Sequence, residues 1–134
     1  MSYSQKILIV EDVGLIALDI KTMLFSIGFS DIKIAYSGEE AIKLSELYSP
    51  DLILMDIVLG NGMDGIRTAQ EIQKIHSAPL IYITGSSDAE TQKEVQETSP
   101  FTIIIKPVHF YELEAAVKSA LGLNFTPDLG FNTI

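Results

Sequence analysis

Two acidic stretches that follow apolar runs could carry chemistry in this sequence. Glu11 and Asp12 come directly after "KILIV", and Asp56 comes directly after "DLILM". Short apolar runs rich in β-branched residues are typical of buried strands. Each carboxylate is therefore expected where a strand ends. In parallel sheets ligands bind beyond these strand ends, so Glu11, Asp12 and Asp56 share one small volume if the two strands are neighbours.

Three carboxylates in a small volume need compensating positive charge. At a separation of ~5 Å and an effective dielectric constant of ~20, each pair repels by about 3 kcal/mol. Lys106, directly after the apolar run "FTIII", supplies one positive charge. Magnesium prefers oxygen ligands and binds through one or two carboxylates. Asp12 and Asp56 fit that preference, and a loop carbonyl could complete the protein's share of ligands.

A carboxylate beside a divalent cation can also act as a nucleophile toward phosphorus. Phosphoryl transfer mainly requires positioning and charge neutralisation. Thr84 ends the apolar run "LIYIT", and its hydroxyl could hydrogen-bond a phosphoryl oxygen. Gly85 leaves room for a donor, and Lys106 could neutralise charge. Together with Asp56, these residues predict phosphoryl capture at a carboxylate.

The same residues also have structural interpretations when each is considered alone. Asp56, or the acidic pair after the first strand, could cap a loop or helix, because Asp favours such positions. Thr84 could be an ordinary strand-end hydroxyl, and Lys106 a solvated charge. The functional interpretation rests on all of these features ending strands at the same edge.

Apolar runs and helical patterns alternate along the chain. The expected strands are Lys6–Val10, Ile32–Tyr36, Asp51–Met55, Leu80–Thr84 and Phe101–Ile105. The expected helices are Gly14–Phe29, a helix from the Ser37 capping box through Tyr48, Gly65–Ile75, a helix from the Ser87 capping box to about Glu97, and His109–Leu123. Continuous apolar strands indicate a parallel sheet covered on both faces. Right-handed crossovers then predict a doubly wound α/β domain.

Three details of these helices follow from spacing and end signals. In the first helix, residues at three-to-four spacing indicate helical structure: Leu15, Leu18, Thr22, Phe25 and Phe29. Gly28 is expected to end that helix. Asp64 is expected to be the N-cap of the third helix rather than a ligand.

The composition limits the class of protein. With 134 residues, of which 47% are hydrophobic, the chain suits one packed domain. The net charge of −9 argues against direct nucleic-acid binding, which requires a basic stripe. The absence of cysteine excludes disulfides and thiolate zinc sites. No signal-peptide core or run of ~18 apolar residues is present, so we expect a cytoplasmic location without membrane contact.

Five short motifs make the sequence resemble the receiver domain of two-component response regulators. They are "VED" (Val10–Asp12), "DLILMDI" (Asp51–Ile57), "MDG" (Met63–Gly65), "ITG" (Ile83–Gly85) and "KP" (Lys106–Pro107). The resemblance extends from about Lys6 to Leu121. It implies a flavodoxin-like fold, in which a five-stranded parallel sheet of order 2-1-3-4-5 has helices on both faces. The expected domain is 1–123, with 124–134 as a C-terminal tail or linker stub.

The resemblance also implies a role for each residue at the sheet edge. Asp56 would be the phosphoacceptor, and its donor would be the phosphohistidine of a sensor histidine kinase or phosphotransfer protein. Thr84 would contact the phosphoryl group, and Lys106 would form an ion pair with it. Such a domain is a switch that catalyses its own phosphorylation and dephosphorylation without being a conventional enzyme.

The cofactor implied by the resemblance is Mg²⁺. Asp12 and Asp56 would ligate it, Glu11 would help directly or through water, and the backbone carbonyl of Val58 would be the third protein ligand. The output would be a downstream protein that binds the last two helices and the strand between them. The same surface could form a homodimer.

The sequence departs from the family pattern in two places. The loop "LGNGMDG" is glycine-rich and one residue longer than the usual proline-containing loop. Ile103 stands three residues before Lys106, where the family usually has Tyr or Phe as a rotamer switch. The signal is therefore expected to pass through backbone shifts in the Ser86–Glu97 helix and the fifth strand.

Three other functions are alternatives to that of a receiver domain. A Mg²⁺-dependent phosphohydrolase with an aspartyl nucleophile would carry a second carboxylate at the place of Val58. A flavin-binding domain would need a phosphate-binding loop after the first strand, where "EDVG" is acidic. A pseudo-receiver, which binds partners without being phosphorylated, would lack an acidic or lysine residue of the site. The chain could be a stand-alone regulator or one module of a larger one.

Overall fold

The computed structural model describes residues 2–60, 62–86 and 92–123. Within them, strands and helices alternate as β1 Ile7–Val10, α1 Gly14–Ile27, β2 Ile32–Ala35, α2 Gly38–Tyr48, β3 Leu52–Asp56, α3 Gly65–Gln73, β4 Leu80–Thr84, α4 Lys93–Glu97, β5 Thr102–Ile105 and α5 Phe110–Ala120. The strands form one parallel sheet in the order β2-β1-β3-β4-β5. The predicted fold class and strand order are confirmed.

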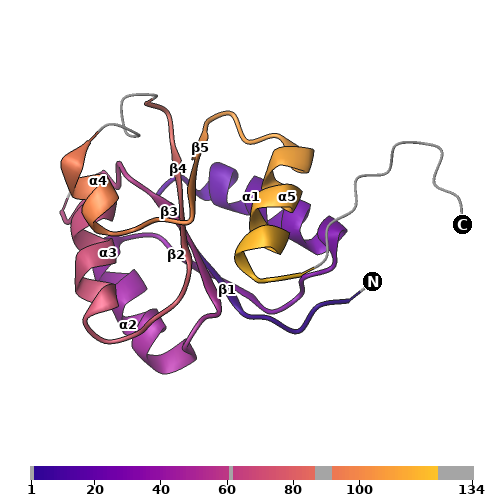
Figure 1. Ribbon diagram of the computed structural model, residues 1–134, viewed down its shortest axis with the longest axis horizontal. Helices are drawn as coiled ribbons and strands as arrows, with labels where there is room; N and C mark the ends of the chain where they lie inside the picture. The colour runs from indigo at the N-terminus through magenta and orange to yellow at the C-terminus, as the bar shows by residue number, and fades with distance from the viewer. Residues whose placement is uncertain (1, 61, 87–91, 124–134) are drawn as a thin grey trace, which may run out of the picture.

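The sheet separates two hydrophobic clusters. In Figure 1, α1 and α5 lie on one side of the sheet, and α2, α3 and α4 lie on the other. Because successive side chains of a strand point to opposite faces, Ile7 and Ile9 of β1 join the cluster under α1 and α5, whereas Leu8 and Val10 join the other. All four are buried, which explains why β1 has no polar alternation.

The register of the central strands aligns their carboxyl ends. Val10 of β1 pairs with Met55 of β3. The next residue of each chain segment, Glu11 and Asp56, therefore comes to the same edge of the sheet. The carboxyl ends of β4 and β5 reach this edge as well, because both strands run parallel to β3.

The residues whose spacing predicts helix α1 are not the ones that the helix buries. Leu15, Leu18 and Phe25 are 81%, 55% and 49% exposed. The residues that face the sheet are Ala17, Ile20, Leu24 and Ile27. The helix is confirmed, but its apolar residues surround most of the axis, so two overlapping three-to-four series exist in the sequence. Only contact with the sheet decides which series is buried.

The ends of the first three helices follow recognisable signals. Gly28, with φ of 127°, ends α1, and its N–H bonds to the carbonyls of Leu24 and Phe25. The Ser37 hydroxyl accepts a hydrogen bond of 3.1 Å from the N–H of Glu40 at the start of α2. Asp64 is the N-cap of α3, because its carboxylate accepts a 2.8 Å hydrogen bond from the N–H of Arg67.

Some predicted boundaries differ or cannot be compared. Helix α3 ends at Gln73 rather than Ile75, and α5 spans Phe110–Ala120 rather than His109–Leu123, as expected for fraying helix ends. The fourth helix does not run unbroken from a capping box at 87–90 to Glu97, because Gln92 is extended and α4 begins at Lys93. The capping box itself and the predicted tail 124–134 lie outside the described residues, so the domain boundary stays a prediction. No helix in the described ranges combines the length and apolarity needed to cross a bilayer.

Candidate functional site

Three carboxylates meet at the carboxyl edge of the central strands. Glu11 and Asp12 follow β1, and Asp56 is the last residue of β3. One oxygen from each carboxylate lies within 4.8 Å of the other two. Glu11 and Asp56 are 1% and 5% exposed, whereas Asp12 is open to solvent. Two charges are thus held in a poorly solvated place, and the third faces outward.

Lys106 reaches this cluster from the end of β5. Its Nζ lies 2.9 Å from Oε1 of Glu11 and 3.2 Å from Oδ2 of Asp56. It is a hydrogen-bond donor to both carboxylates. The ammonium therefore compensates the two buried carboxylates, while the outward carboxylate of Asp12 has solvent in front of it.

The buried charges shift one another's protonation. Burial raises the pKa of Glu11, and the charge of Asp56 raises it further, against the lowering effect of hydrogen bonds from Lys106 and the N–H of Val13. Burial by itself would lower the pKa of Lys106, but the hydrogen bond and charge of Glu11, with those of Asp56, outweigh burial and raise it. Lys106 therefore stays charged at neutral pH.

The loop after β3 fits closely around Asp56. The N–H of Val58 donates a 3.2 Å hydrogen bond to Oδ1 of Asp56. Gly65 is required by space, because a methyl group there would overlap the carbonyl oxygen of Asp56. Gly60 has φ of 61°, and a Cβ there would lie 2.8 Å from Oδ2 of Asp12. Glycine therefore allows this loop to approach both acidic residues.

Thr84 and Gly85 occupy the end of β4 at the same edge. Thr84 is buried, and its hydroxyl oxygen accepts a 3.3 Å hydrogen bond from the N–H of Ser86. A Cβ added to Gly85 would meet nothing within 4 Å. Among the described residues, none fills the space directly beside Gly85.

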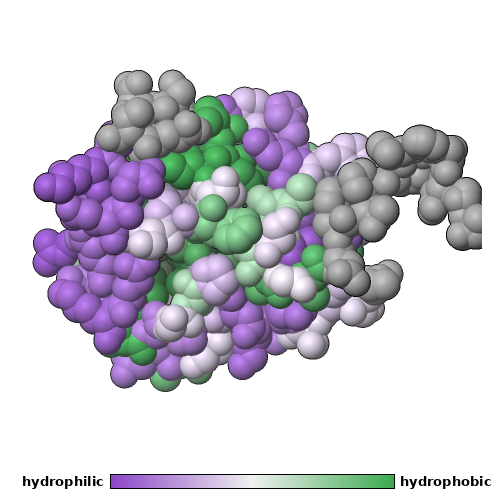
Figure 2. All heavy atoms as spheres, viewed as in Figure 1, coloured by the Kyte–Doolittle hydropathy of each residue, from purple (hydrophilic) through white to green (hydrophobic). Residues whose placement is uncertain are grey.

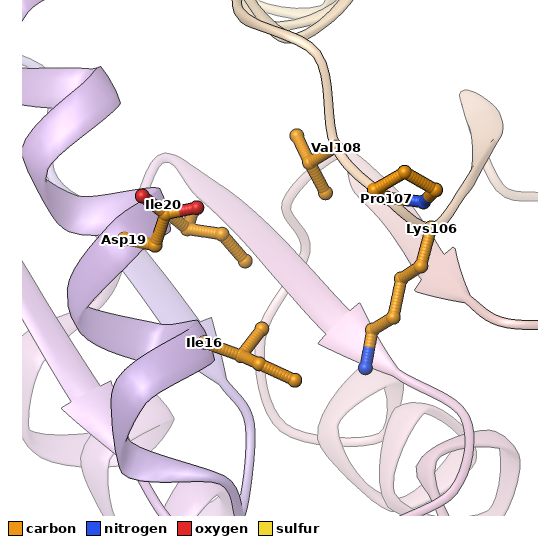
Figure 3. A pocket seen from close by; sticks show the side chains of 6 residues that line it. All are labelled: Ile16, Asp19, Ile20, Lys106, Pro107 and Val108. Atoms are coloured by element: carbon orange, nitrogen blue, oxygen red, sulfur yellow. The ribbon is translucent and has the colours of Figure 1, made fainter.

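A hollow lies beside Lys106, and its existence was not predicted from the sequence. It has a volume of about 410 Å³ between α1 and the segment after β5. Figure 3 shows Ile16 and Ile20 of α1 facing Pro107 and Val108 across it, with the Lys106 side chain extending away from Val108. The walls are mainly apolar, and Asp19 is the acidic residue among them. No local sequence pattern reveals this hollow, because its walls are distant in the chain.

The donor set suits a hard divalent cation. The cluster offers carboxylate oxygens, and the outward position of Asp12 gives a hydrated ion access. Magnesium binds through one or two carboxylates and keeps several waters. Zinc, in contrast, favours His and Cys. The residues present therefore fit Mg²⁺.

Comparison with known proteins agrees with this arrangement. The family model described as the response regulator receiver domain matches residues 7–118. The chain belongs to this family. As a receiver domain it is a module of phosphorylation-controlled signalling.

Two curated relatives are longer than this receiver domain. The transcriptional regulatory protein PdtaR of Mycobacterium tuberculosis is 32% identical over 117 residues, which cover 87% of this chain and 57% of PdtaR. The phyllosphere-induced regulator PhyR of Methylorubrum extorquens is 34% identical, over 87% of this chain and 43% of PhyR. The chain thus spans about half the length of these relatives.

A solved structure also resembles the receiver domain closely. It is the signal receiver domain of a modulated diguanylate cyclase from Desulfovibrio desulfuricans, with a TM-score of 0.82 and 32% sequence identity. The match covers 90% of this chain and 95% of that one. The similarity therefore extends over the whole domain rather than over a shared sheet alone.

Proposed function

We propose that this receiver domain is a Mg²⁺-dependent switch that accepts a phosphoryl group on Asp56. The observation that carries the proposal is the pairing of Lys106 with both Glu11 and Asp56 inside a cluster of three carboxylates. One ammonium cannot neutralise three carboxylates, and a divalent cation supplies the missing charge. The arrangement thus needs a cation before a phosphoryl group, itself an anion, can enter.

The reaction proposed at Asp56 is a phosphoryl exchange. An oxygen of Asp56 attacks phosphorus of a phosphohistidine, a phosphorus–oxygen bond forms, and the phosphorus–nitrogen bond breaks with its electron pair returning to the imidazole. Lys106 stabilises the charge on the phosphoryl oxygens, and the hydroxyl of Thr84 hydrogen-bonds one of them. Water later attacks phosphorus, which releases phosphate and restores the carboxylate.

The same proposal assigns the metal ligands. Asp12 and Asp56 would bind Mg²⁺ directly, Glu11 directly or through water, and the backbone carbonyl of Val58 would be a further ligand. The bound ion would neutralise phosphoryl oxygens in the transition state. The hydrogen bond from the N–H of Val58 to Asp56 supports this assignment, since it holds the loop against the carboxylate.

The phosphodonor is proposed to be a sensor histidine kinase or phosphotransfer protein that docks on α1. Val13, Leu15 and Leu18 are exposed along the start of α1, and Val58, whose N–H donates a hydrogen bond to Asp56, is 68% exposed. Exposed apolar side chains beside a hollow are typical of a protein contact. Because phosphohistidine is formed from ATP, the proposal also places the chain in the cytoplasm.

The output surface is proposed to lie on α4, β5 and α5, where a downstream protein or a second copy would bind. Figure 2 shows hydrophilic residues gathered over α3 and α4 and a band of more apolar residues between them and α5. Phe101 before β5 and Tyr111 in α5 are 50% and 77% exposed. Both could contact a partner when the domain is phosphorylated.

A mass measurement tests the function directly. The wild-type chain incubated with acetyl phosphate and Mg²⁺ should gain the mass of one phosphoryl group, and Asp56→Asn should not. Asp51→Asn, which changes an exposed carboxylate at the opposite edge of the sheet, is the matched control and should behave as the wild type. An unmodified wild type would reject the proposal in favour of a pseudo-receiver. Sustained release of phosphate from a phosphomonoester would instead favour a phosphohydrolase.

A further inference from the structure

Helix α4 is attached to the rest of the domain by few apolar contacts. In its described part, Lys93–Glu97, the buried residue is Val95. The sequence "KEVQE" is otherwise charged or polar. An element with so little buried apolar surface is expected to open and shift easily. Polar contacts at its end therefore have a large share in fixing its position.

A buried chain of hydrogen bonds provides such contacts. Tyr82 in β4 is fully buried, and its hydroxyl lies 2.7 Å from Oγ1 of Thr98, directly after α4. The Thr98 hydroxyl donates a 2.6 Å hydrogen bond to the carbonyl of Val95. Since that proton is already used, Tyr82 is the donor to Thr98. Gln73 of α3 adds a 2.7 Å hydrogen bond to the carbonyl of Thr98.

Tyr82 is also close to the phosphoacceptor site along β4. It precedes Thr84 by two residues, so both side chains point to the same face of the sheet. Its register partner on β5 is Ile103. Tyr82 thus places an aromatic hydroxyl on β4, beside the position on β5 that Ile103 occupies.

We propose that Tyr82 is a positioning residue through which the phosphorylation state of Asp56 reaches α4. The inference rests on the proposed function of Asp56. A displacement at the end of β4 near Thr84 is carried by the strand to Tyr82. The hydrogen bonds from Tyr82 to Thr98, and from Thr98 to Val95, pass it to the last turn of α4. The side chain of Ile103 has no polar atom that could form such a hydrogen bond to α4.

Two substitutions remove the connection while keeping the packing. Tyr82→Phe deletes one hydroxyl, and Thr98→Val deletes the other in a side chain of similar shape. Thr98→Ser keeps the hydroxyl and is the rescue control. Because Tyr82 lies outside the carboxylate cluster, all three variants should reach the same extent of phosphorylation as the wild type, measured by intact mass after acetyl phosphate and Mg²⁺.

Amide hydrogen exchange of residues 92–97, measured with and without phosphorylation, tests the inference. Losing the hydroxyl should speed exchange in the unphosphorylated state by about fivefold, the scale of one buried neutral hydrogen bond. A purely structural role would speed exchange equally in both states. We expect instead that Tyr82→Phe and Thr98→Val lose most of the phosphorylation-dependent difference, while Thr98→Ser retains it.

Each other outcome is decisive as well. If the two variants phosphorylate normally and keep the full difference, Tyr82 does not couple the site to α4. The inference also fails if phosphorylated wild type shows no change at 92–97. If the wild type takes up no phosphoryl group, the proposed function itself fails, and mass spectrometry identifies that case before any exchange is measured.

Discussion

Lys106 is the residue on which the balance of charge at the site depends. Its ammonium contacts two buried carboxylates, and its side chain is 23% exposed, compared with 68% for Lys74 in its ion pair with Glu71. Exposed ion pairs contribute little to stability because solvent screens them. Removing one partner from a poorly solvated pair costs more, because the remaining charge loses its compensation.

We predict that Lys106→Met lowers the free energy of unfolding by about 1–3 kcal/mol in metal-free buffer. The matched control, Lys74→Met, should lower it by less than about 1 kcal/mol. Urea denaturation in the presence of EDTA measures both values. Equal losses in the two variants would show that Lys106 does not compensate the carboxylates.

The buried phenol of Tyr82 makes stability depend on alkaline pH. Burial raises the pKa of Tyr82 above its ordinary value, and the charge of Asp64 raises it further. As pH rises above the unfolded pKa of ~10, the unfolded chain loses this proton first. The folded state then binds more protons than the unfolded state, so stability falls with pH.

Wild type should therefore lose stability relative to Tyr82→Phe at high pH. At pH 11, one unit above the unfolded pKa, its advantage should be smaller than at pH 8 by at most about 1.4 kcal/mol, the loss reached when the folded phenol stays protonated. Urea denaturation of both proteins from pH 8 to 11 measures the difference, in which all other titrating groups cancel. A constant difference would mean that the phenol ionises equally well in both states.

At the scale of elements, α1 presents apolar side chains to solvent. The side of α1 that faces away from the sheet carries Leu15, Leu18 and Phe25, all exposed. The hollow between α1 and the segment after β5 adjoins it. These exposed apolar side chains start in the first turn of α1, which follows Glu11 and Asp12 in the chain. A protein that delivers a phosphoryl group to Asp56 would therefore cover them.

We predict that Leu18→Asp slows phosphotransfer from a histidine kinase by at least about tenfold, as expected for a charge placed in an apolar contact. The probe is whichever autophosphorylated kinase domain in a panel phosphorylates the wild-type chain fastest. Phosphorylation by acetyl phosphate, which needs no docking, should be unchanged. Leu47→Asp on α2, where Leu47 is 84% exposed, is the control and should leave both rates intact. If Leu18→Asp slowed both donors equally, the site rather than the docking surface would be damaged.

At the scale of the whole molecule, the net charge of −9 has to be separated from the local site. A strongly acidic protein repels itself, and any salt reduces that repulsion. A specific ion, in contrast, stabilises the folded state according to its affinity for one place. Magnesium is expected to do both, and the two effects need separate controls.

We predict that Mg²⁺ at about ten times its dissociation constant raises the free energy of unfolding of the wild type by about 1.4 kcal/mol. Asp12→Asn should lose most of this gain. Asp19→Asn makes the same change in net charge on α1, outside the three-carboxylate cluster, and should retain the gain. Thermal unfolding with and without Mg²⁺ measures this gain. The reference sample contains EDTA, and Na⁺ replaces Mg²⁺ so that the ionic strength is constant. If Asp12→Asn kept the gain, the stabilisation would come from general screening of the negative charge rather than from ion binding at Asp12.

Much of the fold could be predicted from the sequence because the central strands β1, β3 and β4 are buried on both faces. The continuous apolar run "KILIV" indicates a strand covered on both faces, and the acidic residues after it are therefore expected at the edge where that strand ends. The end of α1 at Gly28 and the N-cap of α3 at Asp64 could also be predicted, because both signals act through the local backbone. The strand order came from the family resemblance, since no local pattern states which strands are neighbours.

The amino-acid sequence alone determined that carboxylates, a hydroxyl and a lysine stand at the ends of parallel strands, because each of them ends or directly follows an apolar run. Tertiary structure alone decided that Lys106 bonds to Glu11 and Asp56, residues 95 and 50 positions away. It also decided which apolar series of α1 is buried and that Tyr82 reaches Thr98. The physical reason is the same in each case. These choices depend on contacts between distant segments, and local periodicity carries no information about which segments meet.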